Sequence, residues 1–210
     1  MKKYLSIAFS LFTVFARAQE PKLITDCTVT YDVTVEDAKA SADVIKAMSG
    51  ATKVLYMRGS KTRSDLEASG FKQTTLFDSK SDSTVVLREL GTAKYISYLD
   101  ENKRKEKQKK YDGIKFENTN EKKTILGYEA SKVIAKLVDG SSYNVYYTKS
   151  MMPVTKEYEY QFKDLPGFVL EYEALSEDGK LRVKYSASKI SLVPVPVAMF
   201  DVPKSGYRVI

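Results

Sequence analysis

Glu171 and Glu173 are the pair of residues in this sequence whose type and spacing could support acid–base chemistry. They alternate with apolar residues, so they would share one face of a strand, roughly 7 Å apart. That separation is compatible with the two carboxylates of a glycoside hydrolase. Alternating glutamates are also typical of the solvated face of an amphipathic strand, and nothing nearby in the sequence marks a pocket. We therefore interpret the pair as surface residues.

The sequence lacks the residues that most other catalytic mechanisms need. There is no histidine and a single cysteine, Cys27, so the commonest general base, the usual zinc ligands and the standard partner of a nucleophilic serine are missing. Neither a GxxxxGK[ST] loop nor a GxGxxG fingerprint occurs. We expect a binding protein rather than an enzyme, without cofactor or metal, and keep a carboxylate hydrolase as the catalytic alternative. Cys27 is expected to be a small buried apolar residue.

Positive charge is concentrated in the run KRKEKQKK, which holds six cationic residues and one acidic residue in a sequence of formal net charge +7. Such a run is usually a solvated segment, and a helix and a long loop are both compatible with it. The second interpretation is contact with an anionic membrane or envelope protein, where each cation contributes about 1 kcal/mol. Nucleic-acid binding is not expected, because aromatic residues are not interleaved. The candidate contact residues are Lys103, Arg104, Lys105, Lys107, Lys109 and Lys110.

The first eighteen residues have the pattern of a secretory signal peptide. Lys2 and Lys3 precede an apolar run over residues 4–15, and residues 16–18 (ARA) place alanines where a signal peptidase reads small residues. The run is shorter than the roughly 20 apolar residues that span a bilayer. We expect residues 1–18 to be removed and residues 19–210 to form a single soluble periplasmic domain, with secretion as the alternative.

The elements that must position these residues are mainly short strands. Residues 27–35 alternate between apolar and polar side chains with many β-branched residues, as in a half-buried strand. A helix is expected over residues 37–48, with Gly50 after its end. Hairpin turns are indicated at Asp139-Gly140 and at residues 177–179. Further strands are predicted over residues 53–58, 62–67, 72–77, 84–90, 94–99, 114–119, 123–126, 128–137, 142–149, 168–175 and 180–192. The pattern predicts a mainly β (α+β) domain with an antiparallel curved sheet or half-barrel and one or few helices on its concave face.

Aromatic residues suggest how such a sheet could hold a ligand. The sequence contains 15 tyrosines and 9 phenylalanines, and most of them are expected in the core. One small helix would not fill the concave face of so many strands, and apolar concavities are typical small-molecule sites. Alternation and motif position give the candidate cavity residues Leu55, Met57, Phe162, Leu165, Phe168, Leu170 and Tyr172.

Residues 164–169 (DLPGFV) resemble the motif of the GLPGLI family of small exported Gram-negative envelope proteins. Residues 125–130 (ILGYEA), 146–148 (YYT) and 200–207 (FDVPKSGY) are similar to further motifs of that family and of a related domain family of unknown function. The resemblance extends over residues 124–207. Within the first motif, Pro166-Gly167 is expected to form a type II turn, in which glycine supplies the positive φ.

Both families look like members of the LolA/LolB-like (lipoprotein localisation factor) superfamily. The resemblance implies an antiparallel half-barrel whose concave side carries helices and whose understood members transport acyl chains or lipids. It also implies a ligand-handling arginine, whose nearest counterpart is Arg58 in residues 57–61 (MRGSK), where the expected Pro and Asn are missing. The leading hypothesis is a periplasmic protein that holds an acyl chain, lipid or other hydrophobic ligand in the concave face. The alternative is an envelope protein-interaction module without a small-molecule ligand.

Overall fold

The computed structural model describes residues 20–37, 40–175 and 181–210. The predicted signal peptide and the predicted turn at residues 177–179 lie outside these ranges. Within the described ranges, no helix combines the length and the apolar character that crossing a bilayer requires.

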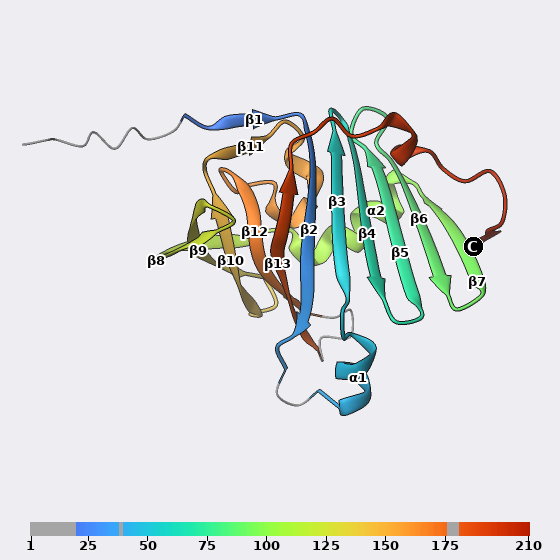
Figure 1. The fold of residues 1–210 in the computed structure, drawn as a ribbon, viewed down its shortest axis with the longest axis horizontal. Coiled ribbons are helices and arrows are strands. Elements are labelled where there is room, and N and C mark those ends of the chain that lie inside the picture. The colour runs from blue at the N-terminus through green and yellow to red at the C-terminus, as the bar shows by residue number, and fades with distance from the viewer. Residues whose placement is uncertain (1–19, 38–39, 176–180) are drawn as a thin grey trace, which may run out of the picture.

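A sheet of twelve strands forms the body of the molecule (Figure 1). Its strands are β2 (Asp26–Val35), β3 (Thr52–Arg58), β4 (Lys61–Ala68), β5 (Phe71–Asp78), β6 (Ser83–Leu90), β7 (Ala93–Leu99), β8 (Lys115–Ile125), β9 (Tyr128–Lys136), β10 (Ser142–Thr148), β12 (Phe168–Leu175), β13 (Arg182–Ser191) and β14 (Arg208–Val209). The order is β14-β7-β6-β5-β4-β3-β2-β13-β12-β10-β9-β8, antiparallel throughout except that β14 runs parallel to β7. The prediction of a mainly β, curved and open antiparallel sheet is confirmed.

Two runs of consecutive strands meet at the centre of this sheet. The first run is β3 to β7, and the second consists of β8, β9, β10, β12 and β13. Strand β2 lies between β3 and β13. Two separately predicted strands, over residues 114–119 and 123–126, are joined in β8, where the register with β9 shifts between Asn118 and Lys122. A small second sheet pairs β1 (Lys22–Ile24) in parallel with β11 (Met151–Pro153).

The helix on the concave face is formed by the cationic run and not by the predicted early helix. Helix α1 (Ala42–Ala47) contains no buried residue and lies beyond the ends of β2 and β3 (Figure 1). Helix α2 (Glu101–Gln108) begins after Asp100, whose carboxylate accepts a hydrogen bond from the Lys103 backbone N–H at 2.8 Å. It continues as η1 (Lys109–Tyr111) and lies behind the sheet in Figure 1. We call the sheet face that carries α2 the concave face and the opposite face the convex face.

Alternation along β3 shows how the two faces are divided. Lys53, Leu55 and Met57 point to the concave face and are buried, whereas Val54 and Tyr56 on the convex face are partly exposed. The largest core cluster lies over β2, β3 and the strands from β9 to β13, and β1 and β11 contribute Ile24 and Met151 to it. The short helices η2 (Lys156–Tyr158) and η3 (Tyr160–Phe162) pack Tyr158 and Phe162 into the same cluster.

The carboxyl-terminal segment covers the convex face of the other half of the sheet. After β13 the chain forms η4 (Val197–Phe200) and ends in β14 beside β7 (Figure 1). Val202 and Tyr207 pack against a cluster from β5, β6 and β7, and the Tyr207 hydroxyl donates a 2.6 Å hydrogen bond to Glu89. The Arg63 guanidinium donates to the Met199 carbonyl at 2.8 Å. Residues 193–210 therefore form a strap across β3 to β7.

The turn before β12 differs from its prediction. Gly167 does not have a positive φ, so Pro166-Gly167 is not a type II turn. Glycine is needed there for another reason: a Cβ at Gly167 would lie 2.1 Å from the carbonyl oxygen of Thr148 on β10. The motif thus permits close approach of two backbones.

Cys27 is completely buried in the largest core cluster, as expected from the sequence. Burial, reinforced by the neighbouring Asp26 carboxylate, raises the pKa of its thiol to about 12. Because the thiolate is the reactive form, the folded protein should not react with dithiobis(nitrobenzoate) at about pH 8. Addition of urea should release one reactive thiol per chain, measured by absorbance. Equally fast reaction with and without urea would contradict the burial of Cys27.

Candidate functional site

A cavity of about 440 Å³ lies between the concave face of β3 to β7 and a cover made of α2, η1 and the η2–η3 segment. This volume is within the usual range of small-molecule sites. Strand register explains the sheet side of its wall: Thr62 lies opposite Phe77, and Phe77 lies opposite Thr84. Because alternate residues of paired strands share a face, these side chains enter the cavity together.

The sheet side of the wall mixes polar and apolar side chains. Hydroxyl and amide groups come from β4, β5 and β6, and aliphatic and aromatic side chains lie between them. The polar group consists of Thr62, Ser64, Gln73, Thr75 and Thr84, and the apolar group consists of Leu66, Phe77, Val86 and Leu99. The cavity can therefore contact both apolar and polar parts of a ligand.

Tyrosines form the opposite end of the wall. Tyr172 of β12 stacks on Tyr185 of β13 with ring centroids 4.6 Å apart, and Tyr111 and Tyr160 approach from the cover. Burial raises the pKa of Tyr185 to about 12 and that of Tyr172 well above its ordinary value. At neutral pH these hydroxyls are thus uncharged hydrogen-bonding groups.

Lys53 and Glu159 form an ion pair in the cavity wall. Lys53 is 8% exposed, and its ammonium group pairs with the Glu159 carboxylate. The same ammonium donates a 2.8 Å hydrogen bond to the Tyr172 hydroxyl and lies 5.4 Å from the ring centroids of Tyr172 and Tyr185. The pair neutralises both charges and ties the η2–η3 segment to the sheet.

Arg104 of α2 points toward the sheet rather than toward solvent. Its guanidinium pairs with Asp82 in the turn before β6 and lies 5.4 Å from the ring centroid of Phe77. Its side chain is 11% exposed. Arg104 therefore attaches α2 to the concave face and lines the cavity.

The remaining residues of the cationic run differ in their surroundings. Lys105 pairs with Glu101 on the solvent side of the helix. Lys107 is exposed and contributes to the cavity wall, and Lys103, Lys109 and Lys110 are exposed. Contact of these lysines with an anionic membrane or envelope protein stays a prediction. Arg104 is not a candidate for this contact, because its side chain points toward the sheet.

Tyr172 is the predicted cavity residue that the structure places in the cavity wall. The other predicted apolar residues pack in the largest core cluster and are at most 7% exposed: Leu55, Met57, Phe162, Leu165, Phe168 and Leu170. The reason is that η2, η3, β1 and β11 fill the concave face over one half of the sheet, whereas the cavity lies over the other half. The signal missed in the sequence was the set of polar residues in β4 and β5 that face the cavity.

Arg58, the predicted ligand-handling arginine, lies on the opposite side of the sheet. It follows Met57 by one residue, so alternation places it on the convex face. There its guanidinium donates to the Val195 carbonyl and lies 3.7 Å from the Asp26 carboxylate. Arg58 therefore holds the carboxyl-terminal strap and does not line the cavity.

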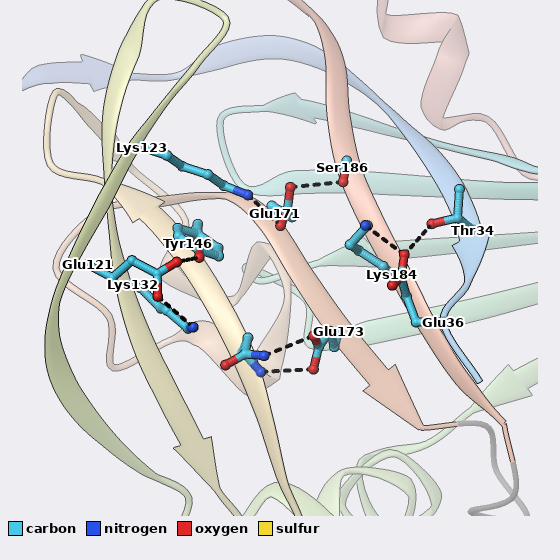
Figure 2. Close-up of polar contacts among 11 residues, drawn as sticks. Thr34, Glu36, Glu121, Lys123, Lys132, Tyr146, Glu171, Glu173, Lys184 and Ser186 are labelled. Atoms are coloured by element: carbon cyan, nitrogen blue, oxygen red, sulfur yellow. Dashed lines mark hydrogen bonds and ion pairs between the residues drawn. The ribbon is translucent and has the colours of Figure 1, made fainter. Parts of the chain in front are cut away.

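Glu171 and Glu173 also lie outside the cavity, within the network of polar contacts shown in Figure 2. Glu171 accepts hydrogen bonds from Lys123 at 2.7 Å and Ser186 at 3.0 Å. Glu173 accepts from the Asn144 side chain at 2.9 Å and pairs with Arg182 at 2.8 Å. These contacts fit an ion-paired outer strand face. Among the described residues, no group of three or more acidic or cysteine side chains is arranged to hold a metal ion.

The fold and the site define an open antiparallel half-barrel with a cavity on its concave face. No family model and no curated protein matches the sequence. Among solved structures, PNGF-II is similar at 15% identity and a TM-score of 0.50, and the match covers 88% of this chain but 30% of the PNGF-II chain. An uncharacterized conserved protein from Thermus thermophilus is similar at 12% identity and a TM-score of 0.49, over 89% of this chain and 90% of that chain. At these identities the likeness concerns the fold alone.

Two further solved structures are similar at lower TM-scores. MucB is similar at 10% identity and a TM-score of 0.42, over 86% of this chain and 58% of that chain. A putative outer membrane lipoprotein-sorting protein domain from Vibrio parahaemolyticus is similar at 10% identity and a TM-score of 0.24, over 84% of this chain and 89% of that chain. Both TM-scores are below 0.5, so neither likeness supports an inference about the fold or the ligands of this chain. The GLPGLI family and the LolA/LolB-like superfamily stay predictions from the sequence motifs.

Proposed function

We propose that this chain is an exported, non-catalytic binding protein that holds an amphiphilic small molecule in the cavity on its concave face. The observation that carries the proposal is the cavity of about 440 Å³ beneath α2, whose wall has both apolar and hydrogen-bonding side chains. Apolar burial would supply most of the affinity, at about 0.8 kcal/mol for each methylene group. The export part of the proposal rests on the signal-peptide pattern of the sequence.

The composition of the wall favours an amphiphile over a purely hydrocarbon ligand. Hydroxyl groups such as those of Ser64 and Thr75 would be desolvated by an alkyl chain without receiving hydrogen bonds from it. Leu66, Val86 and the stacked tyrosines offer apolar contacts beside them. A ligand with an apolar chain and a polar group satisfies both parts of the wall. This narrows the acyl-chain hypothesis drawn from the sequence to molecules that keep a polar end.

Filling the cavity should abolish binding while the fold is kept. Thr75 lies in the middle of the cavity wall, and Phe is well tolerated in strands, so Thr75→Phe should weaken binding of a fluorescent fatty acid by about tenfold or more. The measurement is a fluorescence titration, preceded by mass spectrometry of organic extracts of the purified protein to detect a co-purified amphiphile.

Thr28→Phe is the matched control: it makes the same Thr→Phe change in a strand. Thr28 lies on the convex face of β2, away from the cavity. The affinity of this variant for the fluorescent fatty acid should stay within about twofold of that of the unsubstituted protein, since the cavity wall is unchanged. Equal loss in both variants would contradict binding in the cavity. Absence of any co-purified amphiphile and of saturable binding would favour the envelope protein-interaction module instead.

A further inference from the structure

Two buried polar atoms in the cavity wall have no hydrogen-bond partner. Among the side chains that the structure describes, Thr84 Oγ1 and Arg104 Nε are the buried polar atoms left unpaired. Thr84 is 6% exposed, and the Arg104 side chain is 11% exposed. A buried donor without a partner is costly and rare in folded proteins. Two such atoms in one cavity indicate that something else satisfies them.

The two atoms belong to the same end of the cavity. Thr84 lies opposite Phe77 on the neighbouring strand β5, and the Arg104 guanidinium lies 5.4 Å from the Phe77 ring centroid. Asp82, two residues before Thr84, holds the Nη2 end of Arg104. On its other side Thr84 lies opposite Leu99, directly before the first residues of α2. Strand β6 and helix α2 thus present both atoms beside one aromatic ring.

The charges around this end favour an anion. The cavity wall holds four cationic and two acidic side chains. Two of the cations are already paired, Lys53 with Glu159 and Arg104 with Asp82. Arg88 also lines the cavity, but it lies four residues beyond Thr84 on β6, roughly 13 Å along the strand. It donates from Nε to Gln73 at 2.9 Å. Lys107 lies one turn after Arg104 on the same side of α2. Within the described ranges, neither Arg88 nor Lys107 forms an ion pair, and Lys107 is the one beside Arg104, so its charge is available to a ligand at this end.

We infer that the α2 end of the cavity is a subsite for an oxyanion, a carboxylate or a phosphate, built around Thr84 and Arg104. This inference rests on the proposed function, because the anion would be the polar end of the bound amphiphile. Oxygen atoms of such a group accept from the Arg104 Nε–H and the Thr84 hydroxyl, and bonds between charged groups are the stronger ones. The apolar part of the ligand then extends along Val86 and Leu66 toward the tyrosines.

The test compares amphiphiles that differ at the polar end. Dodecanoate, dodecyl phosphate and dodecanol are titrated calorimetrically into the purified protein and into Thr84→Val and Arg104→Lys. Both variants should lose about tenfold in affinity for the two anions and stay within about twofold for dodecanol, because they remove the donors and keep the apolar wall. Thr84→Val should also raise the urea midpoint of the ligand-free protein, since it removes an unpaired buried hydroxyl. Thr75→Val, elsewhere in the cavity, is the control. Any change in its affinity should be the same for dodecanoate, dodecyl phosphate and dodecanol.

The outcomes separate this inference from the proposed function. If Thr84→Val and Arg104→Lys lose the same affinity for dodecanoate as for dodecanol, the inference of an oxyanion subsite is wrong, and the proposed amphiphile binding still stands. Unchanged dodecanoate affinity in both Thr84→Val and Arg104→Lys would overturn it too, whatever the urea midpoint, because the two atoms would then not contact the bound anion. If no amphiphile binds, inorganic phosphate and acetate are titrated alone. Saturable phosphate or acetate binding that Arg104→Lys removes would support a site for a free anion, and its absence would overturn the inference.

Discussion

Replacing Gly167 with alanine should lower the free energy of unfolding by about 3 kcal/mol, at the upper end of what overpacking a protein interior costs. The added Cβ would lie 2.1 Å from the Thr148 carbonyl oxygen and 3.0 Å from the Tyr147 ring. Thr148 is completely buried and pairs with Phe168 across β10 and β12, so its carbonyl cannot move without disturbing the sheet. Urea unfolding followed by circular dichroism measures the change.

Gly70→Ala is the control for this substitution. Gly70 has φ of +71°, and a Cβ added there would have nothing within 4 Å, so alanine meets a conformational cost of about 1–2 kcal/mol and no clash. The difference between the two variants therefore measures the contact with Thr148. If Gly167→Ala lowers the free energy of unfolding no more than Gly70→Ala does, β10 and the turn before β12 can separate at little cost.

Replacing Lys53 with methionine should destabilise the fold by about 3–5 kcal/mol, as expected when one partner of a buried ion pair is removed. Methionine fills a similar volume, but it leaves the Glu159 carboxylate, whose side chain is 18% exposed, without its cation. The Tyr172 hydroxyl also loses its 2.8 Å hydrogen bond from the ammonium group. The free energy of unfolding in urea is the measured quantity.

The double variant Lys53→Met/Glu159→Gln tests the reason for this loss. Removing both charges should recover most of the stability, because the penalty comes from the unpaired carboxylate rather than from the missing attraction. Lys105→Met is the matched control: its pair with Glu101 is exposed, so the free energy of unfolding should hardly change. No recovery in the double variant would mean that Lys53 acts through packing against Tyr172 and Tyr185.

Local alternation was sufficient to predict most strands. β3 and β4 coincide closely with the predicted residues 53–58 and 62–67. β3 has one buried face, and the turn that joins the two strands contains Gly59. Helix boundaries and helix positions were predicted less well. The expected helix over residues 37–48 relied on an apolar stripe, yet α1 buries none of its side chains. In α2, by contrast, the inward-pointing Arg104 reaches Asp82, a contact that depends on a residue far away in the sequence.

The position of the cavity could not be derived from local patterns. It depends on which half of the concave face is filled by the segment that contains η2 and η3, and that segment is fixed by long-range contacts such as the pair of Lys53 with Glu159. The predicted residues Leu55 and Leu170 were correctly identified as apolar and inward-pointing, but they became core. The polar residues of β4 and β5 were available as a signal, because hydroxyl groups on a covered sheet face need partners.

The central place of β2 has a consequence for the order in which the chain folds. Within each half, paired strands follow one another along the chain, and the longest connection is the one from β10 to β12, which contains β11, η2 and η3. Each half can therefore assemble through contacts of low sequence separation. The seam between the halves pairs Thr34 with Lys184, which requires closure of a loop of roughly 150 residues. Contacts of such high sequence separation form slowly. We therefore expect the joining of the two halves along β2 and β13 to be the slow step of folding, and to follow synthesis of nearly the entire chain.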